Sequence, residues 1–118
     1  MQVPVQVTFH EIPHSDAVET HVRKHVAKLE GFSDRITACH VVLDAPHRHE
    51  RNGRRHRVRV DLVVPRGEIV VSHAPSDDST STDLYAAIDE AFHRANRRLE
   101  DHVKRQRRRV RAASKQLP

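Results

Sequence analysis

The sequence predicts an α+β two-layer sandwich in which a four-stranded sheet carries both helices on one face. The evidence is one alternating apolar segment, two segments with apolar residues every three or four positions, and three β-rich segments between them. In chain order they give β-α-β-β-β-α. A length of 118 residues suits one domain, which we place at residues 1–111, with a frayed tail over 112–118.

The first strand is predicted at the N-terminus, where polar and apolar residues alternate. Its apolar face consists of Val3, Val5, Val7 and Phe9. Pro4 cannot donate a ladder hydrogen bond, so we expect this strand to lie near a free edge of the sheet.

A helix is predicted after Pro13, where the apolar period changes from two to about 3.6. Either Ser15 or Asp16 can cap it, and Asp16 with Glu19 has capping-box spacing. Gly31 supplies a stop signal. The apolar stripe of this helix consists of Val18, Val22, Val26 and Leu29.

Three strands are predicted over residues 36–44, 56–64 and 68–74, with a short turn at Arg66-Gly67 closing a hairpin. A long basic loop at 46–55 and a polar, acidic connection at 75–82 complete the middle of the chain. The last helix is predicted to begin near Thr82 or Asp83 and to continue towards Val110. Its apolar stripe consists of Leu84, Ile88, Ala91, Ala95, Leu99 and Val103.

Several classes of protein fit the composition poorly. Hydrophobic residues make up 36% and aromatic residues 3%, which leaves little apolar surface for a deep small-molecule pocket. The single cysteine, Cys39, permits no internal disulfide and no cysteine metal cage. The N-terminus does not resemble a signal peptide, and no apolar stretch is long enough to span a membrane. We therefore expect a soluble cytoplasmic protein that does not act on a membrane or a small-molecule substrate.

Catalytic and metal-binding motifs find little support. With three glycines there is no Gly-rich phosphate loop, and no nucleophile elbow or zinc-protease motif occurs. The loop histidines His47, His49 and His56 stand among arginines that would repel a cation. We expect no enzyme activity, no cofactor and no metal. The remaining enzymatic alternative is a magnesium-dependent nuclease that uses three acidic residues, Asp77, Asp78 and Asp83.

Positive charge is concentrated in two places. The formal net charge is +5, yet residues 76–93 contain no Lys or Arg, whereas residues 94–111 contain nine. This number exceeds what the helix dipole can favour at a C-terminus. The loop and strand at 48–59 hold a second group of six arginines. Arginine suits bidentate phosphate contacts, so the clusters favour a polyanionic partner such as structured RNA over a merely solvated helix face.

The run Asp83-Leu84-Tyr85-Ala86-Ala87-Ile88-Asp89, at the start of the last helix, resembles the ribosome hibernation-promoting factor family, which includes ribosome-associated inhibitor A and was once labelled a family of sigma factor modulators. Residues 21–32 resemble the first helix of that family, and residues 36–43 resemble its second strand. The resemblance covers residues 2–105. Glu100 and Asp101 depart from it, because relatives commonly carry basic residues there.

The resemblance implies a non-catalytic inhibitor of translation that binds the small ribosomal subunit, in the channel for messenger and transfer RNA. Basic residues on both helices would face the ribosomal RNA, and Lys24, Lys28, Arg94 and Arg97 match those positions. Tyr85 is expected to be a packing residue. The full candidate RNA-binding set adds cations from both clusters: Arg23, Lys24, Lys28, Arg54, Arg55, Arg57, Arg59, Arg94, Arg97, Arg98, Arg105 and Arg108.

We expect the free protein to be a monomer with the small subunit as its partner. Two other functions stay open on the residues alone. One is a general binder of structured RNA outside the ribosome, and the other is a regulator that binds a protein.

Overall fold

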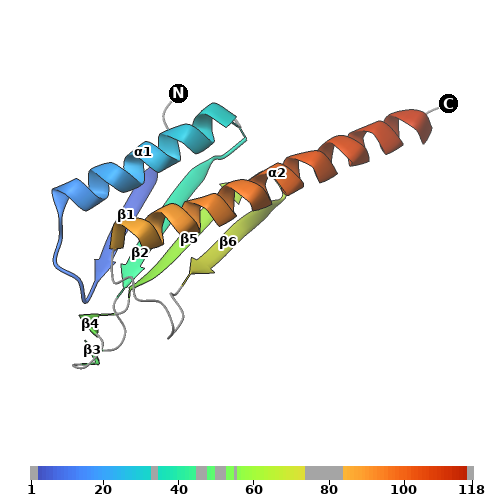
Figure 1. Cartoon of the computed structure of the whole chain (residues 1–118). Helices are drawn as coiled ribbons and strands as arrows, with labels where there is room; N and C mark the ends of the chain where they lie inside the picture. Colours follow the sequence, from blue (N-terminus) through green and yellow to red (C-terminus); the bar gives the residue numbers. More distant parts are fainter. Residues whose placement is uncertain are drawn as a thin grey trace.

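The computed structural model describes residues 3–32, 35–44, 48–49, 53–54, 56–73 and 84–116 (Figure 1). The elements in chain order are β1 (Val5–His10), α1 (Asp16–Phe32), β2 (Ala38–Asp44), β3 (Arg48–His49), β4 (Gly53–Arg54), β5 (Arg57–Val64), β6 (Gly67–His73) and α2 (Leu84–Gln116). Apart from the short strands β3 and β4, this is the predicted order, and the predicted fold class is confirmed.

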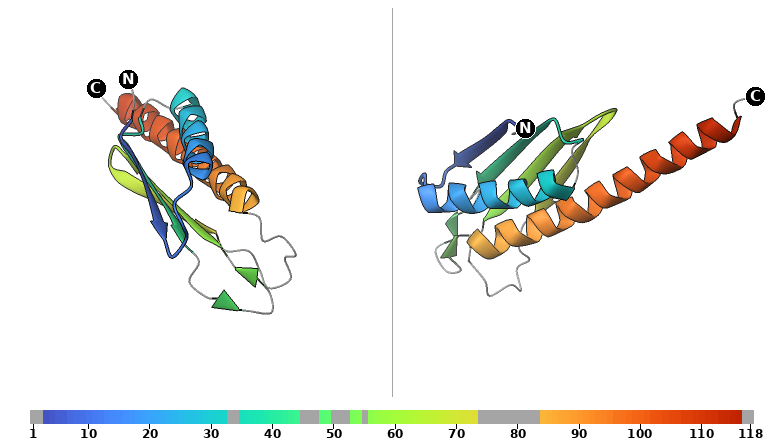
Figure 2. Two further views of the ribbon diagram at one scale, coloured as in Figure 1. Left: turned by 90° about the vertical axis from the view of Figure 1, so that its left-hand side faces the viewer. Right: turned by 90° about the horizontal axis from the view of Figure 1, so that it is seen from above.

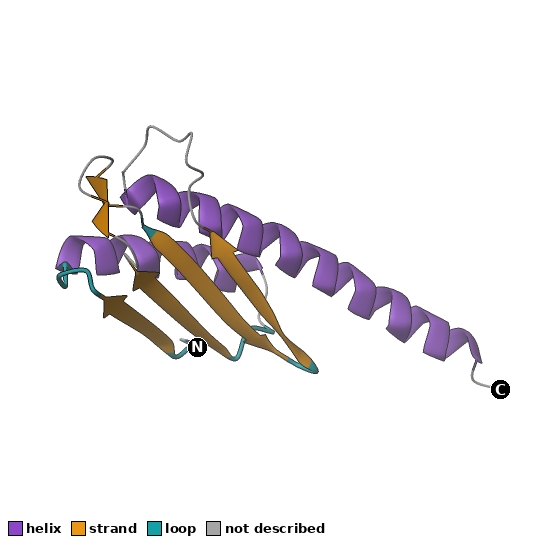
Figure 3. Cartoon of the chain, turned by 90° about the horizontal axis from the view of Figure 1, so that it is seen from below, coloured by secondary structure: helices purple, strands orange, loops and turns teal. Residues whose placement is uncertain are grey.

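The main sheet has four strands in the order β1-β2-β5-β6, and β3 pairs with β4 in a separate two-stranded sheet. β1 is parallel to β2, because α1 carries the chain back across the sheet between them, whereas β2, β5 and β6 are successively antiparallel. β1 lies at the edge of the sheet, as Pro4 led us to expect. Both helices cover the same face, and the opposite face carries no helix of the described residues (Figures 2 and 3).

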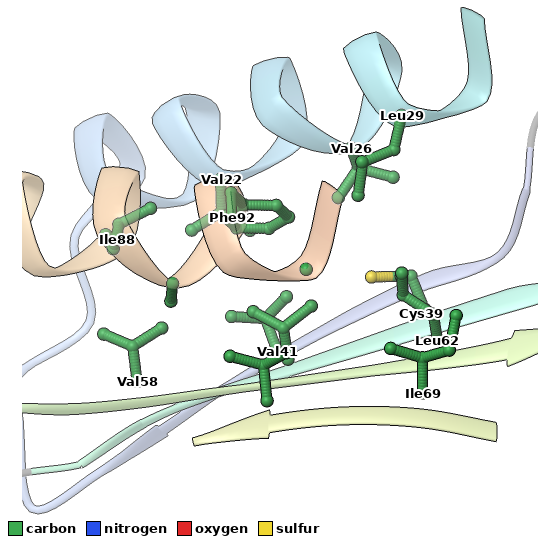
Figure 4. Packing of buried hydrophobic residues seen from close by; sticks show 14 of the residues in the cluster. Val22, Val26, Leu29, Cys39, Val41, Val58, Leu62, Ile69, Ile88 and Phe92 are labelled. Atoms are coloured by element: carbon green, nitrogen blue, oxygen red, sulfur yellow. The ribbon is translucent and has the colours of Figure 1, made fainter. Parts of the chain in front are cut away.

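The core lies between the two helices and the sheet, and it consists of the apolar side chains that both layers turn inward (Figure 4). Every second residue of β5 is buried, beginning at Val58. α2 packs over β5 and β6, whereas α1 packs against β1 and α2. Ala91 and Ala95 are fully buried on α2, where their small side chains let the helix approach the strands closely. Burial also raises the pKa of the Cys39 thiol to about 12, aided by the charges of Asp61 and Glu30.

α2 extends well beyond the sheet (Figures 1 and 3). Leu99 is the last residue of α2 in the buried core and Val103 packs against it. The sequence predicts a frayed tail from Ala112, but the backbone is helical up to Gln116. None of the helices in the described ranges combines the length and the hydropathy needed to cross a membrane.

The structure decides three local predictions: the cap of α1, the end of α1 and the position of the β5–β6 turn. Ser15 is the cap of α1, since its Oγ accepts a hydrogen bond from the Val18 amide at 3.3 Å, and Asp16 is already helical. The helix passes Gly31 and ends at Phe32. The β5–β6 turn lies one residue earlier than predicted.

In that turn Val64 pairs with Gly67, which leaves Pro65 and Arg66 as the two turn residues. Arg66 adopts φ 67°, a left-handed conformation that L-residues with long side chains rarely adopt. Gly67, which could adopt it without cost, instead begins β6.

Replacing Arg66 by Asn is expected to stabilise the protein. Asn tolerates a left-handed backbone better than Arg, and the gain should be about 0.5 to 1 kcal/mol in the free energy of unfolding. Thermal denaturation followed by circular dichroism measures this. Arg66→Gln is the control, because it removes the same charge without relieving the backbone, and an equal gain in both variants would mean that charge is the cause.

His73 ends the inward-facing row of β6, beyond Ile69 and Val71. Its Nδ1 is buried without a hydrogen-bond partner among the described residues. Burial lowers the pKa of His73, the Arg94 guanidinium lowers it further, and Glu90 opposes them.

The unfolded chain therefore takes up a proton at His73 at a higher pH than the folded protein does. We expect the stability that depends on neutral His73 to be present above its ordinary pKa of 6.5 and to be lost as the pH falls below that value. Unfolding midpoints of wild type and His73→Gln, compared between about pH 7 and about pH 5, test this. The wild type should lose more stability than the variant, and parallel losses would contradict the prediction.

Candidate nucleic-acid interface

On α1, the candidate cations lie away from the core. Arg23, Lys24 and Lys28 are exposed and lie off the buried stripe. Arg23 Nε lies 3.8 Å from a carboxylate oxygen of Glu19, one turn earlier on the helix. Lys24 and Lys28 form no ion pair with any side chain that the structure describes.

On α2, the cations divide according to their contacts. Arg94 Nε bonds Glu90 at 3.3 Å, and Arg98 Nη1 donates to the backbone carbonyl of Val70 at 2.6 Å. Val70 belongs to β6, an edge strand, so Arg98 satisfies a carbonyl oxygen of that edge. Arg97 is exposed and has no ion pair among the described side chains. The sequence did not reveal this difference between neighbouring arginines.

Arg105 and Arg108 lie on the part of α2 that extends past the core, and both are exposed. Lys104, Arg107 and Arg109 surround them. Cations therefore cover most of the circumference of this part of the helix, except the side of Val103, Gln106 and Val110.

Arg57 and Arg59 lie on the sheet face opposite the helices. They alternate with buried valines in β5, and both line a shallow depression on that face with Asp44 and Asp61. Arg59 Nε donates to Asp61 at 2.9 Å, a bond that raises the pKa of the guanidinium. Arg57 stands opposite Asp44 in the strand register.

Asp44 also pairs with His10, whose Nδ1 lies 2.9 Å from the carboxylate. This hydrogen bond and the charge of Asp44 raise the pKa of His10. The positive groups named on this face thus have carboxylates beside them. The structure separates Arg57 and Arg59 from the helix cations, so the twelve candidates do not form one surface.

Several candidates lie outside the described side chains. They are Arg54, whose backbone is in β4, Arg55, and the loop histidines His47 and His49. The acidic residues Asp77, Asp78 and Asp83 of the nuclease alternative also lie outside the described residues.

The seam between the two helices holds a polar group that we did not predict from the sequence. His21 and His25 of α1 both place Nε2 on the same oxygen, Oδ1 of Asp89 on α2, at 2.7 and 2.6 Å. Burial disfavours the Asp89 carboxylate, but the hydrogen bonds from His25 and His21 outweigh it and lower the pKa of Asp89. The four-residue spacing of the two histidines was the available signal, because it places them on one helix face.

The rings of the seam are packed in a fixed order. His25 stacks on Phe92 with ring centroids 4.9 Å apart and an interplanar angle of 11°. Tyr85 meets His21 edge-on at 5.0 Å. Tyr85 is 38% exposed, so it packs against the seam at the surface instead of in the core.

A groove of about 410 Å³ runs along the same seam, lined in part by His25, Lys28, Asp89 and Asn96. Its walls come from both helices. The helix side of the molecule, which carries Lys24, Lys28 and Arg97, is therefore grooved, with a hydrogen-bonded polar group in its wall.

Comparison with known structures supports the fold. The N-terminal domain of Thermus thermophilus Protein Y is 24% identical, with a TM-score of 0.65, and the match covers 86% of this chain and 99% of that one. A ribosomal subunit interface protein from Coxiella burnetii is 17% identical, with a TM-score of 0.68 and the same coverages. A search of curated proteins found no match.

The family model described as sigma 54 modulation protein / S30EA ribosomal protein matches residues 5–107. That range takes in the whole four-stranded sheet, α1 and the core-facing part of α2. It is also the family to which the run at the start of α2 pointed. The chain belongs to the sigma 54 modulation protein / S30EA ribosomal protein family.

Proposed function

We propose that this protein is a ribosome-associated inhibitor of translation that binds the RNA of the small ribosomal subunit in the channel for messenger and transfer RNA. The observation that carries the proposal is the family match over residues 5–107. The similar fold of the Coxiella burnetii ribosomal subunit interface protein is in keeping with it. In this proposal the protein acts in the cytoplasm, is a monomer when free, and uses residues 1–111 as its binding domain.

Charge favours the helices as the surface that contacts RNA. On the sheet face, Arg59 is held by Asp61, and Arg57 stands across from Asp44. A phosphate there would compete with carboxylates that already lie beside the guanidinium groups. On the helix side, Lys24, Lys28 and Arg97 form no ion pair with a carboxylate among the described residues, so a phosphate group would not have to displace one from them.

Within α2, the contacts rank the candidates further. Arg94 and Arg98 are already engaged, with Glu90 and the Val70 carbonyl respectively. Arg97, Arg105 and Arg108 form no ion pair with any side chain in the described ranges, which leaves them available for a partner there. We propose Lys24, Lys28, Arg97, Arg105 and Arg108 as the principal RNA contacts.

Co-sedimentation with isolated ribosomal subunits over a salt series tests the function directly. We expect saturable binding to the small subunit that weakens steeply with salt, because phosphate contacts release counterions. Equal binding to both subunits and to duplex RNA would favour a general binder of structured RNA. Failure to bind either subunit would contradict the proposal and favour a protein partner.

The double variant Lys24→Gln, Lys28→Gln tests the helix surface. We expect its affinity for the small subunit to fall by about tenfold or more, and the slope of log affinity against log salt to flatten by roughly two. The same co-sedimentation series measures both quantities.

The matched control is Arg57→Gln, Arg59→Gln, which removes the same amount of charge from the opposite face. It should bind nearly as well as the wild type. If the two double variants lose affinity equally, the helices are not the specific contact surface and only net charge matters. Circular dichroism melting establishes that both variants are folded.

A further inference from the structure

The seam group formed by His21, His25 and Asp89 has the donor atoms of a metal site. One donor atom from each residue lies within 4.8 Å of the other two. The two histidines come from successive turns of α1, and the aspartate comes from the facing turn of α2. Asp89 is 64 positions from His25 and 68 from His21 in the chain, so the group joins two distant segments.

The ring positions are already set by packing. His25 lies against Phe92, and His21 lies edge-on to both His25 and Tyr85, with ring centroids 5.0 Å apart in both pairs. Both Nε2 atoms consequently converge on one point. A site whose ligands are held before the ion arrives loses little conformational entropy on binding.

A modest movement would admit an ion. Tetrahedral zinc at about 2.0 to 2.1 Å from each donor separates two donors by about 3.3 Å. The Nε2–Oδ1 distances are 2.7 and 2.6 Å, so the carboxylate has to withdraw by less than about 1 Å. Asp89 is the ligand free to do so, since its side chain is 55% exposed, against 29% for His21 and 20% for His25.

The surroundings select the type of cation. Lys28 lines the same groove as His25 and Asp89, so the charge of the groove does not favour a hard cation held mainly by electrostatics. Two imidazole nitrogens with one carboxylate suit a borderline transition metal. The other group of potential ligands in the described residues, His10, Glu11 and Asp44, offers a single histidine.

We propose that His21, His25 and Asp89 bind a divalent transition-metal cation of the zinc type, which links α1 to α2. From the sequence we expected no metal, because only the loop histidines at 47, 49 and 56 suggested a site there. The proposal does not rest on the proposed ribosome binding. Its three protein ligands leave coordination open to water.

Titration of the metal-free protein with Zn²⁺ by calorimetry, and with Co²⁺ by visible absorption, tests the site. We expect one equivalent of either ion to bind. Bound Co²⁺ should show the d–d absorption of a site of low coordination number. His25→Gln and Asp89→Asn should each weaken binding by about tenfold or more. Zn²⁺ should also raise the thermal midpoint of the wild type but not of these variants.

His10→Gln is the matched control, because it removes a histidine that also bonds an aspartate but lies at the end of β1. It should bind Zn²⁺ as the wild type does. His21→Gln alters the more exposed of the two histidines and keeps the test valid if His25→Gln fails to fold.

The proposal is overturned if Zn²⁺ and Co²⁺ do not bind. It is also overturned if His21→Gln and Asp89→Asn bind with wild-type affinity, since the ion would then be held by other histidines of the chain.

Discussion

The one-sided core is the constraint on which the rest of this structure depends. The apolar residues of four strands face a single layer formed by α1 and α2, and no described helix covers the other sheet face (Figure 2). The chain has too few apolar residues to cover both faces. Its charged side chains must therefore occupy two separate surfaces, the outer side of the helices and the open side of the sheet.

In the described part of the chain, cations are paired with carboxylates more often on the sheet surface than on the helix surface, because strands and helices space their side chains differently. In a strand, residues two apart share a face, so Arg59 and Asp61 meet on β5, and register brings Asp44 of β2 opposite Arg57. On the helices, a carboxylate must stand three or four positions from a cation to pair with it. Arg23 and Arg94 have such a partner, whereas Lys24 and Lys28 have no carboxylate at that spacing. Arg97 has Glu100 and Asp101 three and four positions later, but it forms no ion pair among the described residues. The helix surface therefore has the surplus that a polyanion requires.

The sequence was sufficient for the fold because each element has its own period. The alternation of β1 and β5 and the stripes of α1 and α2 predicted the order and the buried faces. The β5–β6 turn was misplaced because Gly67 is the better left-handed residue, yet strand register assigns that conformation to Arg66. The end of α2 was also placed too early. No Gly or Pro stands between Arg111 and Gln116, and alanine favours continuation.

Contacts between residues far apart in the chain could not be predicted from the sequence. The four-residue spacing of His21 and His25 is visible in the sequence, but their contact with Asp89 depends on how α2 is rotated about its axis, which only the packed core determines. The bond from Arg98 to the Val70 carbonyl likewise depends on the distance between α2 and the edge of β6. A sequence can rank cations by composition, whereas the structure distinguishes those already occupied from those still available.

The extended part of α2 shows how fold and partner depend on each other. Beyond Val103 no described residue of α2 belongs to the core, so core packing no longer supports the helix there. Arg105 and Arg109 are four residues apart, as are Lys104 and Arg108, and like charges at this spacing destabilise a helix by about 0.2 to 0.5 kcal/mol per pair. A polyanion on this surface would offset that repulsion, because it attracts both cations of each pair. Binding and helix stability in this segment are therefore coupled, and the charge that weakens the free helix is the charge that would hold it on RNA.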